Sequence, residues 1–142
     1  MSDTLKVCGL TVERGAKLRT YLPVPDTNVK IPLTIINGEQ DGPTLLITAG
    51  IHGGEYPGIA AAMELGRDIE PEHVAGCLIM MHPVNIQGFW ARREMIVPED
   101  GKNLNRVFPG DPMGTLADKT AYLISNNFFS IADFYVDMHS GD

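Results

Sequence analysis

The sequence predicts an α/β fold in three layers, in which a mixed, largely parallel sheet is flanked by helices. Three short apolar runs, at residues 44–49, 77–81 and 133–138, are typical of strands that are buried on both faces of a sheet. Helical patterns follow the first two runs, at residues 57–68 and from Thr115 onward. Because parallel strands need crossover connections, this alternation favours a parallel arrangement of the three runs.

The part of the chain before these runs, residues 1–40, is a strand-rich lead-in of short strands and turns. Residues 30–36 alternate partly and meet an Asn-Gly turn pair at 37–38, and Asp-Gly-Pro at 41–43 predicts another turn. A chain of 142 residues has the length of one domain, so we expect residues 1–142 to form a single α/β domain.

Two helices and one long loop complete the prediction. The first helix has Pro57 in its first turn and stops before Pro71, and the second begins with a capping box formed by Thr115 and Asp118. We expect the first helix to bury a face that comprises Ile59, Ala62, Met63, Leu65 and Ile69. The second helix has two rows at helical spacing, Leu116, Thr120, Leu123 and Asn127, and Ala117, Ala121, Ile124 and Phe128. Residues 84–114 are predicted to be a structureless loop of about 30 residues, a length that is often functional.

The composition excludes several classes of protein. Hydrophobic residues make up 44% of the chain and charged residues 20%, which is ordinary for a globular protein. The net charge of −7 argues against a nucleic-acid partner, and no apolar run approaches the roughly 18 residues that a membrane span needs. Since no secretory signal is visible and Cys8 and Cys77 are too few for a disulfide framework, we expect a cytoplasmic protein. The locally basic segment 92–106 suits a small anionic ligand, although a solvated loop would give the same pattern.

Three of the four histidines follow predicted strands: His52, His82 and His139. Ligands of α/β sheets bind beyond the carboxyl ends of the strands, so we expect these side chains at one edge of the sheet. His52 and Glu55 form His-x-x-Glu across a strand–helix junction, and catalytic zinc takes three such nitrogen or carboxylate ligands. The third ligand would be His139 or His82, and Asp137, on the same strand face as His139, could orient it. A helix-start carboxylate at Glu55 and an acidic strand end at Asp137 are the simpler explanations of those two residues.

Three motifs occur in order along the chain. They are His52-Gly53-Gly54-Glu55-Tyr56-Pro57-Gly58, Asp100-Gly101-Lys102-Asn103-Leu104-Asn105-Arg106-Val107-Phe108-Pro109-Gly110 and Asp137-Met138-His139-Ser140. Together they resemble the succinylglutamate desuccinylase/aspartoacylase family of the zinc-carboxypeptidase-like superfamily, from about Ile31 to the last residue. The resemblance implies a zinc-carboxypeptidase-like fold and one Zn2+ per chain, held by His52, Glu55 and His139.

The resemblance also implies a substrate site. Asn105 and Arg106 match a pair that holds the substrate carboxylate, and a guanidinium suits this role because it grips a carboxylate at two points. Arg92 matches the arginine that polarises the scissile carbonyl, with Arg93 as the alternative because loop lengths vary there. Asn103 stands where some relatives have the Asp of Asp-x-Asn-Arg, which leaves open whether it supports the metal ligands as that Asp would.

The general-base glutamate of the family lies well after the third metal ligand, and no residue of this chain matches it. The chain continues for three residues after His139, so we expect the N-terminal portion of a catalytic domain, with a sheet that is incomplete at its C-terminal end. Its open edge would allow a homo-oligomer. Glu94, Glu99 and Asp142 are carboxylates near the predicted site to which no motif assigns a role.

The function that these residues favour is a zinc-dependent amidohydrolase, a deacylase that cleaves N-acyl amino acids or similar small amides bearing a carboxylate. The alternative is a non-catalytic module that binds zinc and carboxylates, because general acid–base catalysis is worth about 10²–10⁴-fold and its residue is unmatched. A nucleotide-binding domain is disfavoured, since the glycine-rich loop has neither Gly-x-Gly-x-x-Gly nor Gly-x-x-x-x-Gly-Lys-Ser/Thr.

Overall fold

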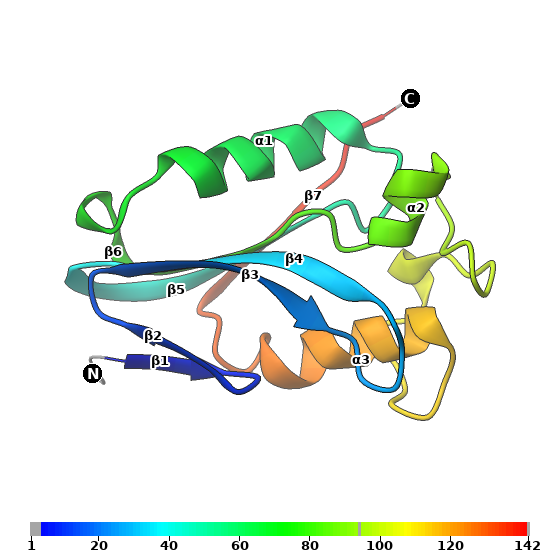
Figure 1. Ribbon diagram of the computed structural model, residues 1–142, viewed down its shortest axis with the longest axis horizontal. Helices are drawn as coiled ribbons and strands as arrows, with labels where there is room; N and C mark the ends of the chain where they lie inside the picture. The colour runs from blue at the N-terminus through cyan, green and yellow to red at the C-terminus, as the bar shows by residue number, and fades with distance from the viewer. Residues whose placement is uncertain (1–3, 94, 142) are drawn as a thin grey trace.

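The computed structural model describes residues 4–93 and 95–141, and a five-stranded mixed sheet forms its middle layer (Figure 1). Across the sheet the strands are β3 (Ala16–Pro23), β4 (Lys30–Asn37), β6 (Ala75–Met81), β5 (Gln40–Ala49) and β7 (Phe134–Met138). β5 pairs in parallel with β6 and β7, whereas β3 and β4 extend the sheet with antiparallel pairings. The predicted α/β fold is therefore confirmed, and its parallel part consists of the three predicted apolar strands.

Two helices cover opposite faces of this sheet. α1 (Tyr56–Asp68) lies on one face, and α3 (Leu116–Asn127) lies on the other beside the hairpin of β1 (Thr4–Val7) and β2 (Leu10–Glu13), as Figure 1 shows. The crossover from β5 to β6 and the crossover from β6 to β7 run in opposite directions across the sheet, and right-handed crossovers then place their helices on opposite faces. The chain therefore leaves the carboxyl ends of β5 and β6 toward different faces, and ligands of such sheets bind at this edge.

The narrow contact of α1 with the sheet departs from the predicted broad apolar face. Ile59 and Ala62 are buried as predicted, but Met63 and Leu65 are exposed. The reason is that Gly58 and Gly66 also face the sheet, and a Cβ on Gly66 would lie 3.1 Å from Thr34 Oγ1. Close approach at glycines leaves room for only a thin apolar strip. The two predicted rows of α3, by contrast, are mostly buried; the buried members are Leu116, Ala117, Thr120, Ala121, Leu123, Ile124 and Phe128.

The segment 84–114 is not structureless, so that prediction is wrong. It contains α2 (Ile86–Ala91) and the 3-10 turn η2 (Leu104–Arg106), and a further 3-10 turn, η1 (Pro71–His73), precedes β6. Asn85 caps α2 by accepting a hydrogen bond from the Gly88 N–H at 2.9 Å. Buried Val97 and Leu104 anchor the rest of the segment to the core.

The predicted turn at 41–43 is also wrong, because these residues belong to β5. They form an irregularity in the pairing with β6, between Gln40 and Thr44. A Cβ at Gly42 would come within 2.6 Å of the Ala75 backbone, so the glycine permits a close approach of two strands rather than a reversal. Within residues 4–93 and 95–141, none of the helices combines the length and the apolar character that crossing a bilayer requires.

Candidate metal and substrate site

The carboxyl edge of the parallel strands brings together residues that are far apart in sequence. His52 follows β5, Glu55 immediately precedes α1, and His139 follows β7. Figure 1 shows the end of β7 beside the start of α1, and the Ser140 N–H donates to Glu55 Oε2 at 3.2 Å. The loop that carries His52 is packed tightly, since a Cβ on Gly53 would lie 2.3 Å from the Phe89 nitrogen in α2. The backbone of α2 thus fixes the position of this loop.

The carboxylate of Glu55 lies between two imidazole rings. His52 Nδ1 is 2.8 Å from Oε1, and His139 Nδ1 is 2.9 Å from Oε2. The two ring centroids are 5.1 Å apart. One ligand atom from each of the three residues lies within 4.8 Å of the others, so this group could hold a metal ion.

The outer nitrogen of each ring is held by an oxygen. His52 Nε2 contacts Asn103 Oδ1 at 3.0 Å, and that oxygen also accepts the Asn105 N–H at 2.9 Å. His139 Nε2 contacts Asp137 Oδ2 at 2.7 Å. Because these oxygens only accept hydrogen bonds, both Nε2 atoms carry a proton, and the structure thus gives Asn103 the supporting contact that the sequence left open.

The inner side of the cluster then needs a cation. In neutral imidazoles with Nε2 protonated, both Nδ1 lone pairs face Glu55, which also only accepts. A proton on each ring or a shared metal ion would remove this repulsion. Two nitrogens and one carboxylate, with a supporting oxygen behind each imidazole, are a set of ligands that suits zinc.

The pKa values in the metal-free cluster follow from the same contacts. Burial alone would raise the pKa of Glu55, but the hydrogen bonds from His52 and the Ser140 N–H outweigh it and hold that pKa below its usual value. Burial alone would lower the pKa of His139, but the hydrogen bond and charge of Asp137, followed by Glu55, raise it. The Glu55 carboxylate and the two imidazole rings therefore favour a cation between them.

His82, the other candidate for the third ligand, lies apart from this cluster. Its Nε2 is 2.9 Å from Thr34 Oγ1, and its ring is buried beneath α1, where burial lowers its pKa. A Cβ on Gly66 would lie 3.3 Å from the same nitrogen. The structure therefore brings His139, rather than His82, to His52 and Glu55.

Arg92 and Arg93 are both exposed at the end of α2. Arg92 has a left-handed backbone with φ 53°, and with Tyr56, Phe89 and Trp90 it lines a cavity of about 440 Å³. Tyr56 directly follows Glu55, so this cavity adjoins the metal cluster along the chain. The assignment of Arg92 to the substrate carbonyl stays a prediction.

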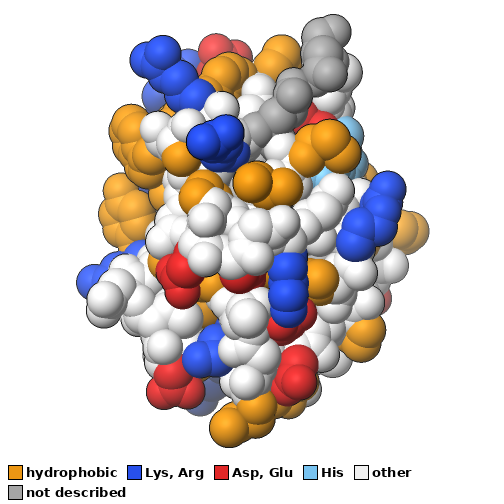
Figure 2. All heavy atoms as spheres, turned by 90° about the vertical axis from the view of Figure 1, so that its right-hand side faces the viewer, with side chains coloured by type: hydrophobic (Ala, Val, Ile, Leu, Met, Phe, Trp, Pro, Cys, Tyr) orange, Lys and Arg blue, Asp and Glu red, His pale blue; other side chains and the backbone are white. Residues whose placement is uncertain are grey.

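Asn105 and Arg106 are exposed on η2, the 3-10 turn that begins directly after Asn103. The Arg106 guanidinium contacts the Asn105 carbonyl at 3.3 Å. Figure 2 shows histidine surface beside a carboxylate on this side of the molecule, with several Lys and Arg side chains around it. Among the other candidate carboxylates, Glu99 is exposed and contacts Gln87, whereas Glu94 and Asp142 lie outside the described residues.

Sequence reasoning missed two residues behind Asp137. Thr48 Oγ1 donates to Asp137 Oδ1 at 2.7 Å and contacts the Tyr135 hydroxyl at 2.8 Å. The available signals were a threonine four positions before His52, within the apolar stretch 45–49, and a tyrosine four positions before His139.

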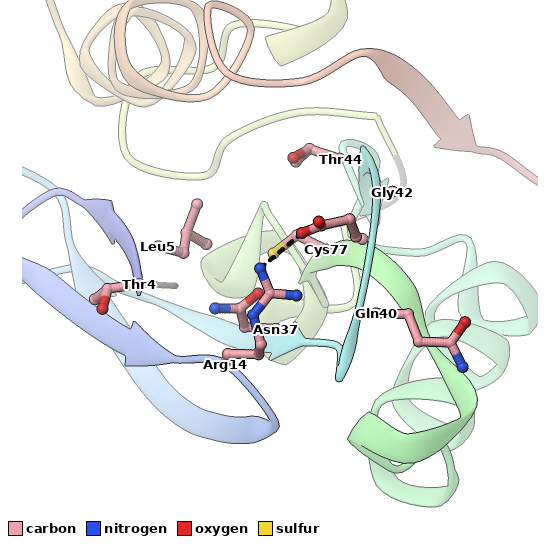
Figure 3. Close-up of a pocket in the computed structure, with 10 residues that line it drawn as sticks. Thr4, Leu5, Arg14, Asn37, Gln40, Gly42, Thr44 and Cys77 are labelled. Carbon is pink, nitrogen blue, oxygen red and sulfur yellow. Dashed lines mark hydrogen bonds and ion pairs between the residues drawn. The ribbon is translucent and has the colours of Figure 1, made fainter. Parts of the chain in front are cut away.

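A second cavity, of about 200 Å³, lies at the opposite edge of the sheet (Figure 3). Its lining includes Asn37 at the end of β4, Thr44 of β5 and Cys77 of β6, and Thr44 lies on the strand that leads to His52. Arg14 crosses it to pair with Asp41 at 2.7 Å, which ties the β1–β2 hairpin side to β5. This cavity is separate from the candidate metal site.

The fold and the cluster define an α/β protein with a candidate metal site at the carboxyl edge of its sheet. The model of the succinylglutamate desuccinylase/aspartoacylase catalytic domain matches residues 41–142, so the chain belongs to that family. It is 40% identical over 128 residues to the N-alpha-acetyl-L-2,4-diaminobutyric acid deacetylase of Halomonas elongata, covering 85% of this chain and 37% of the relative. The family expected from the three motifs is thereby confirmed. Its named members include deacylases.

Two solved structures extend the comparison. The product-bound ectoine utilization protein EutE (DoeB) from Ruegeria pomeroyi matches 92% of this chain and 41% of its own, with 37% identity and a TM-score of 0.84. A succinylglutamate desuccinylase/aspartoacylase from Rhodobacter sphaeroides matches 87% of this chain and 39% of its own, with 37% identity and a TM-score of 0.78. The chain thus spans about two fifths of the length of these relatives.

Proposed function

We propose that this protein is a zinc-dependent deacylase that hydrolyses the amide bond of small N-acyl amino acids. The observation that carries the proposal is the pair of imidazole Nδ1 atoms on the two oxygens of Glu55. Similarity to a named diaminobutyrate deacetylase makes N-α-acetyl-L-2,4-diaminobutyrate the first substrate to test. We place the protein in the cytoplasm, where such small metabolites would be available to it. Its partner would be a small molecule and not a nucleic acid or a membrane.

Zinc bound at the cluster would polarise the amide carbonyl and lower the pKa of a bound water to about 7. The protein's own residues set the geometry for this chemistry. Asn103 and Asp137 hold the two Nε2–H groups, so that both Nδ1 lone pairs are directed at one point beside Glu55. A ligand set fixed in this way loses little entropy when the ion binds.

The substrate would be held by the exposed residues around the cluster. Arg106 would grip the substrate carboxylate at two points, and Asn105 would donate to it. Arg92 would donate to the carbonyl oxygen as negative charge develops there, a role whose removal costs roughly 10²–10³-fold in kcat in other hydrolases. Arg92 and Arg106 belong to the locally basic segment 92–106, which suits a small anionic substrate although the protein as a whole has a net charge of −7.

The metal part of the proposal is tested by elemental analysis of the purified chain. We expect about one zinc per chain, lost in His52→Ala and retained in His73→Ala, which removes an exposed histidine of η1. A metal-free preparation that folds but does not take up zinc again would overturn the proposal.

A second candidate is a module that binds zinc and a carboxylate without turnover. It is favoured by the contacts of Glu55 and Asp137, because both oxygens of each carboxylate are already engaged. Neither is placed to accept a proton from water. Deacylation that is abolished by a chelator and restored by zinc would exclude this candidate, whereas zinc binding with no turnover of a panel of N-acyl amino acids would favour it.

A further inference from the structure

A chain of hydrogen bonds runs behind His139, away from the cluster. His139 Nε2 contacts Asp137 Oδ2 at 2.7 Å, and Asp137 Oδ1 accepts from Thr48 Oγ1 at 2.7 Å. The Tyr135 hydroxyl contacts the same Thr48 oxygen at 2.8 Å. Four side chains, on β5, on β7 and directly after β7, are therefore connected in series.

The direction of these hydrogen bonds is fixed by chemistry. A carboxylate only accepts, so the single hydroxyl proton of Thr48 is used on Asp137. The Tyr135 hydroxyl must then donate to Thr48, and His139 Nε2–H must donate to the other carboxylate oxygen. The pKa of Tyr135 is raised to about 12, by burial and against the Thr48 hydrogen bond, so the phenol keeps its proton at any physiological pH.

The strands themselves place these groups. Thr48 and Asp137 are register partners in the parallel pairing of β5 with β7. Tyr135, Asp137 and His139 alternate along the chain and share one face. The Tyr135 ring is packed against Phe129, with centroids 4.9 Å apart, and Thr48 is fully buried. Neither hydroxyl is held by a loop.

We infer that Thr48 and Tyr135 are positioning residues of the metal centre: they fix the Asp137 carboxylate, which in turn fixes the ring of His139. The inference rests on the proposed metal-binding function and extends it to two residues that touch no metal ligand. His52 has a comparable two-step support, in which Asn103 holds the ring and the Asn105 N–H holds Asn103. In both cases an oxygen that faces the ring is itself oriented from behind.

The test compares Thr48→Val, Thr48→Ser and Tyr135→Phe for zinc affinity, by competition with a chromophoric chelator. Losing a partner that orients a metal-bound histidine costs about 10–100-fold in affinity, and we expect Thr48→Val to lie near tenfold. Tyr135→Phe should weaken binding less, and Thr48→Ser should restore wild-type affinity because it keeps the hydroxyl. The matched control is Thr34→Val, which removes an equally buried threonine that hydrogen-bonds His82 instead, and which should leave zinc affinity unchanged.

The inference is overturned if Thr48→Val binds zinc as the wild type does, or if Thr34→Val loses as much affinity. A readout that needs no metal separates it from the proposed function: the His139 Nε2–H signal in nitrogen-15 NMR of the metal-free protein. This proton should exchange faster in Thr48→Val than in the wild type and Thr34→Val. If the wild type took up no zinc, the proposed function would fail. If exchange of the His139 Nε2–H were the same in Thr48→Val as in the wild type, the positioning role would be overturned as well.

Discussion

Replacing Asn103 with alanine should weaken zinc binding by about one to two orders of magnitude. The side-chain oxygen of Asn103 accepts the His52 Nε2–H at 3.0 Å and the Asn105 N–H at 2.9 Å. His52 is only 7% exposed, so its ring N–H would lose its acceptor with little access to water, at a cost of about 1–3 kcal/mol. We expect the ring to turn in the metal-free variant, which would limit this cost.

Bound zinc would remove that freedom, because a ring held through Nδ1 would keep its Nε2–H pointing at the missing oxygen. The cost therefore appears in the binding free energy, where about 1.4 kcal/mol is a factor of ten in Kd. The Asn105 N–H, in contrast, lies in an exposed turn and can bond to water. Stability of the metal-free protein should accordingly fall by only about 1 kcal/mol.

The assay is a competition titration of the metal-free protein with a chromophoric zinc chelator, accompanied by urea unfolding. Asn103→Asp is the matched control, because it keeps the acceptor oxygen and adds a negative charge beside the ring. It should bind zinc at least as tightly as the wild type. The reasoning would be refuted by a wild-type Kd in Asn103→Ala, or by an equal loss in the aspartate variant.

Three further predictions concern other parts of the site and the core. Burial lowers the pKa of His139, but Asp137 raises it by more, so protons should compete with zinc for this ring as the pH falls through the raised pKa. Zinc affinity should be constant above that pKa and should drop about tenfold per pH unit below it. An affinity that does not change with pH would contradict this prediction. Gly53→Ala should weaken zinc binding, because its Cβ would meet the α2 backbone at 2.3 Å, whereas Gly141→Ala, with nothing within 4 Å, should bind normally in the same titration. Phe128→Ala should cost about 3–5 kcal/mol in urea unfolding, since the ring is fully buried, and a loss below about 1 kcal/mol would exclude its place in the core.

The parallel strands were predictable from the sequence because burial on both faces makes a strand continuously apolar. The edge at which His52 and His139 meet followed from the same pattern, since both residues come directly after such strands. The strand pattern did not choose between His82 and His139, because both stand at carboxyl ends of parallel strands; only the resemblance of the motif Asp137-Met138-His139-Ser140 favoured His139. The His82 N–H continues the pairing with β4, by donating to the Pro32 carbonyl, and the ring turns under α1 onto Thr34. Strand neighbours, which a single sequence does not reveal, decided between them.

The sequence pattern could not predict short helices or contacts between distant side chains. α2 has six residues, fewer than two helical turns, so no periodicity could mark it, and its Asn85 cap looks like any loop asparagine. Thr48 was missed for a similar reason, because a threonine within the apolar stretch 45–49 changes no periodicity. Its partner, Asp137, is 89 residues away, and only the register of β5 with β7 brings the two together.

That register links metal binding to the assembly of the sheet. Among residues 4–93 and 95–141, β7 pairs with β5 alone, in parallel. His139 reaches Glu55 only when β7 is paired with β5, because Asp137 must first meet Thr48 in register. An ion that binds only the paired state stabilises it by RT ln(1 + [L]/Kd), about 2.7 kcal/mol at a hundredfold excess over Kd. A bound ion would therefore cross-link β7 to β5, and the residues that orient His139 also support this pairing.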